Sequence, residues 1–184
     1  MKKSLAFLYG LNYPRQLLEK MKIDGGSLEP NFEWTDVFNF VVTAAVLNEW
    51  VIKFYELKGT LVECLKAERV DGYPEPFERW FVDKSCFPNK NFDLKEQVRD
   101  CLSICFHVCN ASKHYHWRRS GDSHGPTTIE RDPQVKDWYQ YFFTKAGPGL
   151  FVKINDRYYS MTQIRDILIP FYEGLLEYLD RGEQ

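Results

Sequence analysis

Apolar residues recur at helical spacing in three stretches of the chain, and these stretches predict a mainly α fold. The longest covers residues 35–58, where two neighbouring apolar stripes predict a central helix that other elements contact on several sides. Further helices are expected over residues 93–115 and 161–181, the first of them antiparallel to the central helix. Thr35 is expected to cap the central helix, and Gly59 to end or bend it. The pattern therefore predicts an up-down helical bundle.

Local signals mark the ends and one irregularity of the later helices. Ser160 followed by Gln163 matches a capping box, in which each side chain accepts a hydrogen bond from the backbone amide of the other residue. Asp93 and Glu96 have the same spacing at the start of the second long helix. Pro170 lies inside the last helix and is expected to kink it, because proline has no amide proton.

The hydrophobic period changes between the second and third long helices. Alternation at residues 150–154, followed by Asn155-Asp156, predicts a small β-hairpin near residues 149–160. Residues 135–143 fit either a strand or a short helix. We expect one domain, which consists of a peripheral N-terminal arm (1–30), a helical core (35–118), a loop (119–133), a hairpin region (134–160) and the C-terminal helix (161–181).

Composition narrows the class of protein. The 184 residues are 44% hydrophobic and 27% charged, as is typical of a folded globular domain. The net charge of −2 provides no overall attraction to nucleic acid or anionic lipid, so any such binding must be local. The five cysteines are odd in number and lack paired CxxC spacing, which favours a reducing cytoplasm over a disulfide framework or a zinc ribbon. No apolar run reaches the ~20 residues that span a bilayer, so no membrane partner is expected. No cofactor is expected either.

The densest group of polar and ionisable residues lies at the end of the second long helix. Asn110 and His114 are four residues apart, so they share a helical face. The functional interpretation makes His114 a general acid or base, with Asn110 and Lys113 holding a phosphate or oxyanion beside it. In the alternative interpretation, His114 fills a polar gap in the core and bonds a backbone carbonyl.

Several neighbouring residues are candidates for binding. Glu49 interrupts the apolar surface of the central helix and is expected either to orient His114 or pair with Lys113, or to be a solvated edge. The residues that follow His114 combine cations with aromatic rings, which can neutralise phosphates and stack on RNA bases. They can equally anchor a helix end whose dipole favours cations. These residues are Tyr115, His116, Trp117 and Arg118.

Three cysteines, Cys101, Cys105 and Cys109, recur every four residues along the same helix. Cys105 and Cys109 with His116 or His107 could be imagined as zinc ligands, and Cys109 with His116 as a nucleophilic pair. Free cysteine is more often a small buried hydrophobe, so we expect the three to pack against the central helix and expect no metal site.

The Asn-x-x-x-His element late in a core helix resembles the HEPN superfamily of higher eukaryote and prokaryote nucleotide-binding domains. It is also similar to uncharacterised bacterial helical proteins in which an Asn-x-x-Lys-His element ends a core helix. The HEPN resemblance implies metal-independent ribonuclease chemistry on RNA or nucleotides in phage defence or toxin–antitoxin systems. It also implies an antitoxin or other protein partner. The family motif places an arginine where this chain has Cys109. The alternative is therefore a non-catalytic protein-interaction module, expected as a homodimer, whose Asn/Lys/His cluster is structural.

Overall fold

A computed structural model describes residues 11–28, 34–68, 78, 94–114, 128–131, 150–154 and 157–182. These residues form helices and one three-stranded antiparallel sheet, so the predicted mainly α fold with a small hairpin is confirmed. The helices are α1 (Pro14–Gly26), α2 (Trp34–Phe54), α3 (Thr60–Leu65), α5 (Leu94–His114) and α7 (Met161–Asp180). The strands are β1 (Thr128–Arg131), β2 (Leu150–Ile154) and β3 (Arg157–Ser160).

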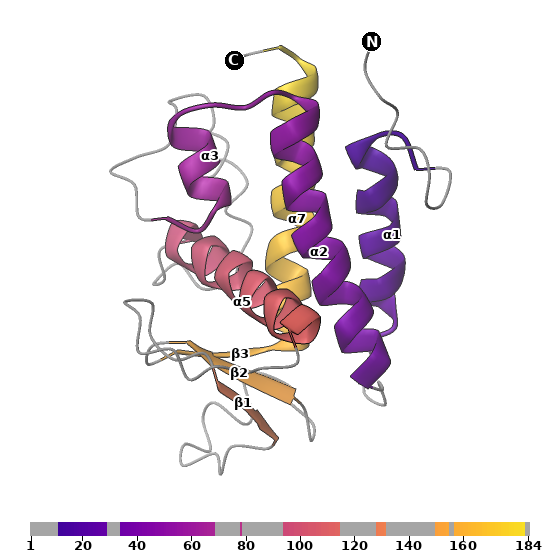
Figure 1. Ribbon diagram of the computed structural model, residues 1–184, viewed down its shortest axis with the longest axis vertical. Coiled ribbons are helices and arrows are strands. Elements are labelled where there is room, and N and C mark those ends of the chain that lie inside the picture. Colours follow the sequence, from indigo (N-terminus) through magenta and orange to yellow (C-terminus); the bar gives the residue numbers. More distant parts are fainter. Residues whose placement is uncertain are drawn as a thin grey trace.

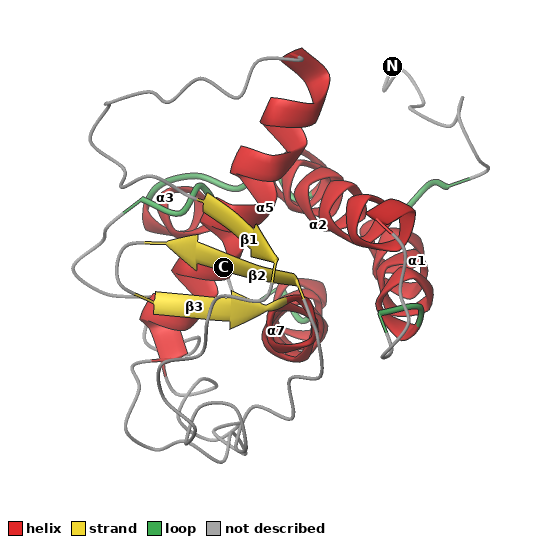
Figure 2. Ribbon diagram, turned by 90° about the horizontal axis from the view of Figure 1, so that it is seen from below, coloured by secondary structure: helices red, strands yellow, loops and turns green. Residues whose placement is uncertain are grey.

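The helices pack around α2. α1 runs in the opposite direction beside it, and α7 runs behind it in the same direction (Figure 1). α5 crosses these helices, as the view along α7 in Figure 2 also shows. The second long helix therefore crosses the central helix obliquely, whereas an antiparallel pair lying side by side was expected. The crossing lets α5 contact α2 on one side and the sheet on another, because its apolar surface is wider than one neighbour can cover.

α1 belongs to the core, although residues 1–30 were expected to form a peripheral arm. Leu18 and Met21 of this helix are buried within the same cluster as the side chains of α2 and α7. Gly25 allows α1 to approach α7 closely, since an added Cβ there would lie 3.0 Å from Cγ of Arg165. The apolar pattern of α1 is weak, because only a few of its residues are apolar and one of these, Ile23, is exposed.

α2 ends at Phe54, four residues earlier than the predicted end at residue 58. The backbone adopts positive φ angles at Glu56 (51°) and Gly59 (64°), which no helix can contain. Gly59 then precedes the separate short helix α3. Thr35 is the second residue of α2 rather than its cap, because the helix begins one residue before the expected start at residue 35. The predicted break at Gly59 is therefore confirmed as an interruption between two helices.

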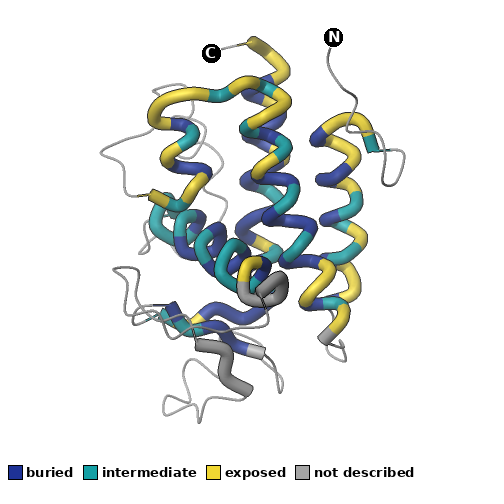
Figure 3. Tube along the Cα trace, viewed as in Figure 1, coloured by how far each residue is buried: buried dark blue, intermediate teal, exposed yellow. Residues whose placement is uncertain are grey.

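Of the described helices, α2 alone has the length and apolar composition to cross a membrane, over Thr35–Phe54. No apolar run of this length was expected from the sequence. Half of this segment is buried inside the fold, and the central helix of a packed core meets the same criterion. The alternation of buried and exposed turns along α2 is visible in Figure 3. Packing on several sides therefore accounts for the composition of α2.

The sheet has the strand order β1-β2-β3 and lies across α5, close to the start of α7 (Figure 2). β2 and β3 form the predicted hairpin, in which Ile154 pairs with Arg157 and Phe151 with Ser160. β1 pairs with the other edge of β2, although residues 119–133 were expected to be a loop. Residues 120–125 are rich in Gly and Ser and predict a loop. The four-residue strand that follows them has a pairing partner about 20 residues away, which local sequence does not reveal. Residues 135–143 and the expected cap Asp93 lie outside the described residues.

The predicted capping box at the start of α7 is confirmed. The amide of Gln163 donates to Oγ of Ser160 at 3.1 Å, and the amide of Ser160 donates to Oε1 of Gln163 at 2.8 Å. α7 then runs without interruption through Pro170 to Asp180. The two reciprocal hydrogen bonds satisfy amides that a helix start otherwise leaves without partners.

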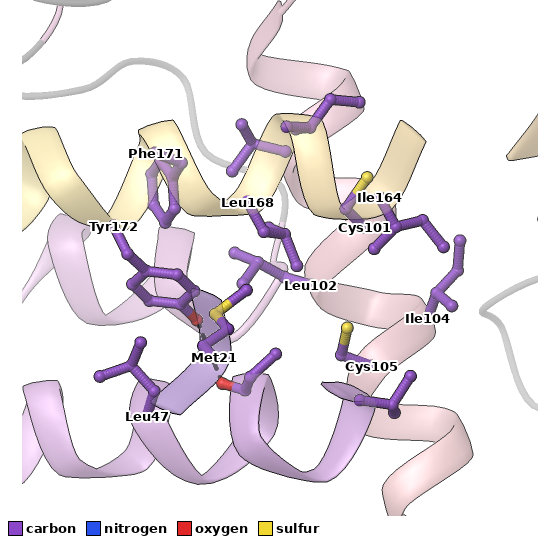
Figure 4. Close-up of a cluster of buried hydrophobic side chains, with 14 of the residues drawn as sticks. Met21, Leu47, Cys101, Leu102, Ile104, Cys105, Ile164, Leu168, Phe171 and Tyr172 are labelled. Atoms are coloured by element: carbon purple, nitrogen blue, oxygen red, sulfur yellow. Dashed lines mark hydrogen bonds between the residues drawn. The ribbon is translucent and has the colours of Figure 1, made fainter. Parts of the chain in front are cut away.

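Two buried polar residues connect α2 to its neighbours. Nδ2 of Asn48 donates to the carbonyl of Leu65 in α3 at 2.6 Å, and its Oδ1 accepts from the Tyr172 hydroxyl of α7 at 3.0 Å. Figure 4 shows Tyr172 reaching from α7 towards α2, beside Leu47. The hydroxyl of Thr43 donates to Asp24 of α1 at 2.6 Å. Both polar side-chain atoms of Asn48, Nδ2 and Oδ1, are therefore hydrogen-bonded inside the core, and the residue is 0% exposed.

Replacing Asn48 by alanine is therefore expected to destabilise the protein strongly. Asn48→Ala leaves the Leu65 carbonyl and the Tyr172 hydroxyl buried without these partners, which should cost about 2–4 kcal/mol in the free energy of unfolding. Urea denaturation followed by circular dichroism measures this value. Asn39→Ala is the matched control, because Asn39 is exposed on the same helix and its loss should change stability by about 0.5 kcal/mol or less. Equal effects of the two substitutions would contradict the role assigned to Asn48.

Candidate functional site

The C-terminal end of α5 carries the predicted site. Along this helix one face is buried, and Cys109 is part of it, whereas the next residue, Asn110, is exposed. In Figure 2 this end of α5 extends beyond the other helices. Asn110 therefore lies at the rim of the core, with its side chain directed to solvent.

Lys113 and His114 occupy the last turn of α5, which ends at His114. Since both Asn110 and His114 belong to this helix, their spacing of four places them on one side of it. The side chains of Lys113 and His114 lie outside the described set, as do residues 115–118 in full. The binding roles of Tyr115, His116, Trp117 and Arg118 thus stay predictions.

Glu49 lies on an exposed part of α2. Its Oε2 is 3.4 Å from Nζ of Lys53, one turn further along the same helix. Exposed pairs of this kind contribute little to stability, because water screens both charges. The environment of Glu49 fits the solvated-edge alternative, while a contact with Lys113 or His114 stays a prediction.

The cysteines of α5 pack in the core, as predicted. Cys101 lies beside Ile164 of α7, and Cys105 lies on the side of α5 that faces α2 (Figure 4). Burial raises the pKa of the Cys101 thiol and that of the Cys105 thiol, because a thiolate in an apolar environment is poorly solvated. Within the described part of the chain, no group of three histidine, cysteine or acidic side chains is arranged to hold a metal ion.

A partly buried charged cluster between α5 and the hairpin was not predicted from the sequence. Oδ2 of Asp100, whose side chain is 2% exposed, accepts from the Tyr159 hydroxyl at 2.9 Å and lies 3.0 Å from Nε of Arg157. Nη1 of the same guanidinium donates to Oε2 of Glu96 at 2.8 Å. The four residues Glu96, Asp100, Arg157 and Tyr159, hereafter the Asp100 cluster, attach β3 to α5.

Burial dominates the electrostatics of the Asp100 cluster. Loss of hydration raises the pKa of Asp100, and the hydrogen bond from Tyr159 and the charge of Arg157 only partly oppose it. Burial and the neighbouring carboxylate also raise the pKa of Tyr159, so its hydroxyl stays a donor. Two signals could have indicated this cluster. Glu96 and Asp100 are one helical turn apart, and Arg157 and Tyr159 share a face of one strand.

No protein-family model, curated protein or solved structure matches this chain.

Because the four described cysteines are buried, we expect them to resist alkylation in the folded protein. Iodoacetamide treatment followed by peptide mapping should find Cys64, Cys101, Cys105 and Cys109 labelled at least about a hundredfold more slowly than in denaturant, since labelling requires local opening. The same mapping in guanidinium is the control. Rapid native labelling of Cys109 would contradict its packing and reopen the nucleophile alternative for that residue.

Proposed function

We propose that the C-terminal end of α5 binds RNA or nucleotide phosphate, and that His114 supplies acid–base chemistry of the metal-independent ribonuclease type. The observation that carries this proposal is the exposure of Asn110 beside the buried Cys109. An asparagine that completed an internal polar network would be buried. Its exposure instead leaves Asn110 accessible to a ligand.

The end of a helix also suits the proposed roles of the two ionisable residues. Free carbonyls give the last turn a partial negative charge, which stabilises a protonated imidazole and a lysine ammonium there. A protonated His114 is the form that donates a proton to a leaving oxygen. Lys113 would contribute a point charge for phosphate, with Asn110 as a neutral hydrogen-bond donor.

The aromatic and basic residues after His114 extend the proposal to single-stranded RNA. Tyr115 and Trp117 would stack on unpaired bases, while His116 and Arg118 would contact phosphates. With Cys109 in the position of the family's arginine, stabilisation of the charged transition state would fall to Lys113 or Arg118. Glu49 is left out of the proposed site, because its described ion pair is with Lys53 of the same helix.

A second candidate is a non-catalytic protein-interaction module. The burial of Cys109 favours this candidate. Cys109 occupies the position of the family's arginine, and a side chain buried in the core cannot contact a ligand. In this case a second copy of the chain or an antitoxin-like protein would cover the end of α5.

Cleavage of RNA by the full chain tests the first candidate. We expect wild-type protein to cleave a labelled single-stranded RNA of mixed sequence in the presence of EDTA. His114→Ala should reduce the rate by about 100-fold or more, as loss of a general acid or base does. Lys53→Ala is the control, because Lys53 is an exposed lysine of α2 outside the proposed site. Wild-type cleavage no faster than that of His114→Ala would exclude the catalytic role.

Binding measured by fluorescence anisotropy separates the two candidates. We expect Lys113→Ala to weaken RNA binding and to reduce the slope of log affinity against log salt by about 0.7, the value for one phosphate contact on a single strand. Lys53→Ala should leave both quantities unchanged. If wild-type protein neither binds nor cleaves RNA, the interaction module is the better account.

A further inference from the structure

Two carboxylates of the Asp100 cluster share the guanidinium of Arg157, whereas the second nearby cation, Arg99, contacts only Glu96, with Nη2 at 3.6 Å from Oε1. Arg157 is shared, because its guanidinium contacts Asp100 through Nε and Glu96 through Nη1. The only polar contacts of the Asp100 carboxylate among the described residues are those of Arg157 and Tyr159, and both involve Oδ2. Glu96 is partly exposed and keeps water as an alternative partner, whereas Asp100 is almost completely buried. The cost of burying charge therefore falls on Asp100.

We propose that the Asp100 cluster is a proton-dependent latch, which holds the β2–β3 hairpin on α5 more tightly when the Asp100 carboxyl is protonated. A neutral carboxyl can still accept the hydrogen bonds of Tyr159 and Arg157 through its carbonyl oxygen, and it carries no buried charge. Arg157 meanwhile keeps its ion pair with Glu96. When the hairpin moves away, Asp100 regains water, and the ionised form is favoured again.

The charged and titratable groups that act on Asp100 come from α5 and β3. α5 supplies Glu96, Arg99 and the neutral thiol of Cys101, and β3 supplies Arg157 and Tyr159. Lys153 of β2 instead lies over the ring of Tyr158, with Nζ 5.4 Å from its centroid. Glu96 is the other carboxylate of the Asp100 cluster, and its side chain is 41% exposed and paired with Arg157.

The sign of the pH effect follows from linkage. Asp100 has a raised pKa in the closed state and an ordinary one in the open state, so the closed state binds more protons between these two values. The closed latch is most stable below the ordinary pKa, and this contribution is lost as the pH rises through the raised value. A single proton limits the change in the opening equilibrium to about tenfold per pH unit.

Hydrogen–deuterium exchange of the full chain measures this opening. After correction for intrinsic exchange, the amides of β2 and β3 in wild-type protein should become less protected as the pH rises from about 4 to about 8. Asp100→Asn, which keeps the shape and an acceptor oxygen, should make protection of these strands independent of pH. Asp166→Asn is the matched control, because Asp166 is an exposed acid of α7 paired with Arg165, and it should keep the wild-type profile. A flat wild-type profile, or the same slope in Asp100→Asn, would overturn the proposal.

A second variant distinguishes proton-dependent opening of the hairpin from a general loss of packing. Tyr159→Phe removes the hydroxyl that stabilises ionised Asp100, so the step in hairpin protection should move to higher pH. A loss of packing alone would lower protection at every pH without moving the step.

If both variants fail to fold, carboxyl carbon NMR of the wild-type chain provides the measurement. In that case the Asp100 carboxyl must titrate with the same midpoint as the protection of the hairpin. Different midpoints would refute the latch.

Discussion

α2 can be buried only if other helices cover it on several sides, and this requirement organises the described structure. Its apolar residues occupy more than one face, so α1, α5 and α7 each cover a part of it. The buried polar atoms of α2 add direction to this packing. Thr43 is directed to α1, while Asn48 is directed to both α3 and α7. Apolar burial brings the helices together, and these hydrogen bonds fix their positions along one another.

The sequence was most informative where structure depends on neighbouring residues. The helical periodicity of α2, α5 and α7, the capping box of Ser160 and the alternation of β2 are all local, and each of them is found in the structure. Features that depend on distant partners were missed. β1 has only four residues and exists through its pairing with β2. The crossing direction of α5 also follows from how side chains of different helices interlock, which periodicity does not encode.

The position of the candidate site could be predicted from the sequence, but the contacts between α5 and the elements around it could not. The polar residues at the end of α5 are evident in the sequence, and helical spacing separates the buried Cys109 from the exposed Asn110. The Asp100 cluster was not evident, because its members are about 60 residues apart and each has an ordinary role in its own segment. Asp100 lies among apolar residues of α5, and only the folded arrangement shows that β3 supplies its partners.

Ser160 has two roles, since it is the last residue of β3 and the cap of α7. No linker separates the strand from the helix, so the orientation of one determines that of the other. A slip of β3 by one residue would change which side chain opens α7 and would turn its faces by about 100° around the helix axis. Pairing of Phe151 with Ser160 therefore sets which side of the last helix enters the core. The pairing of this short sheet therefore determines which residues of α7 are buried in the core.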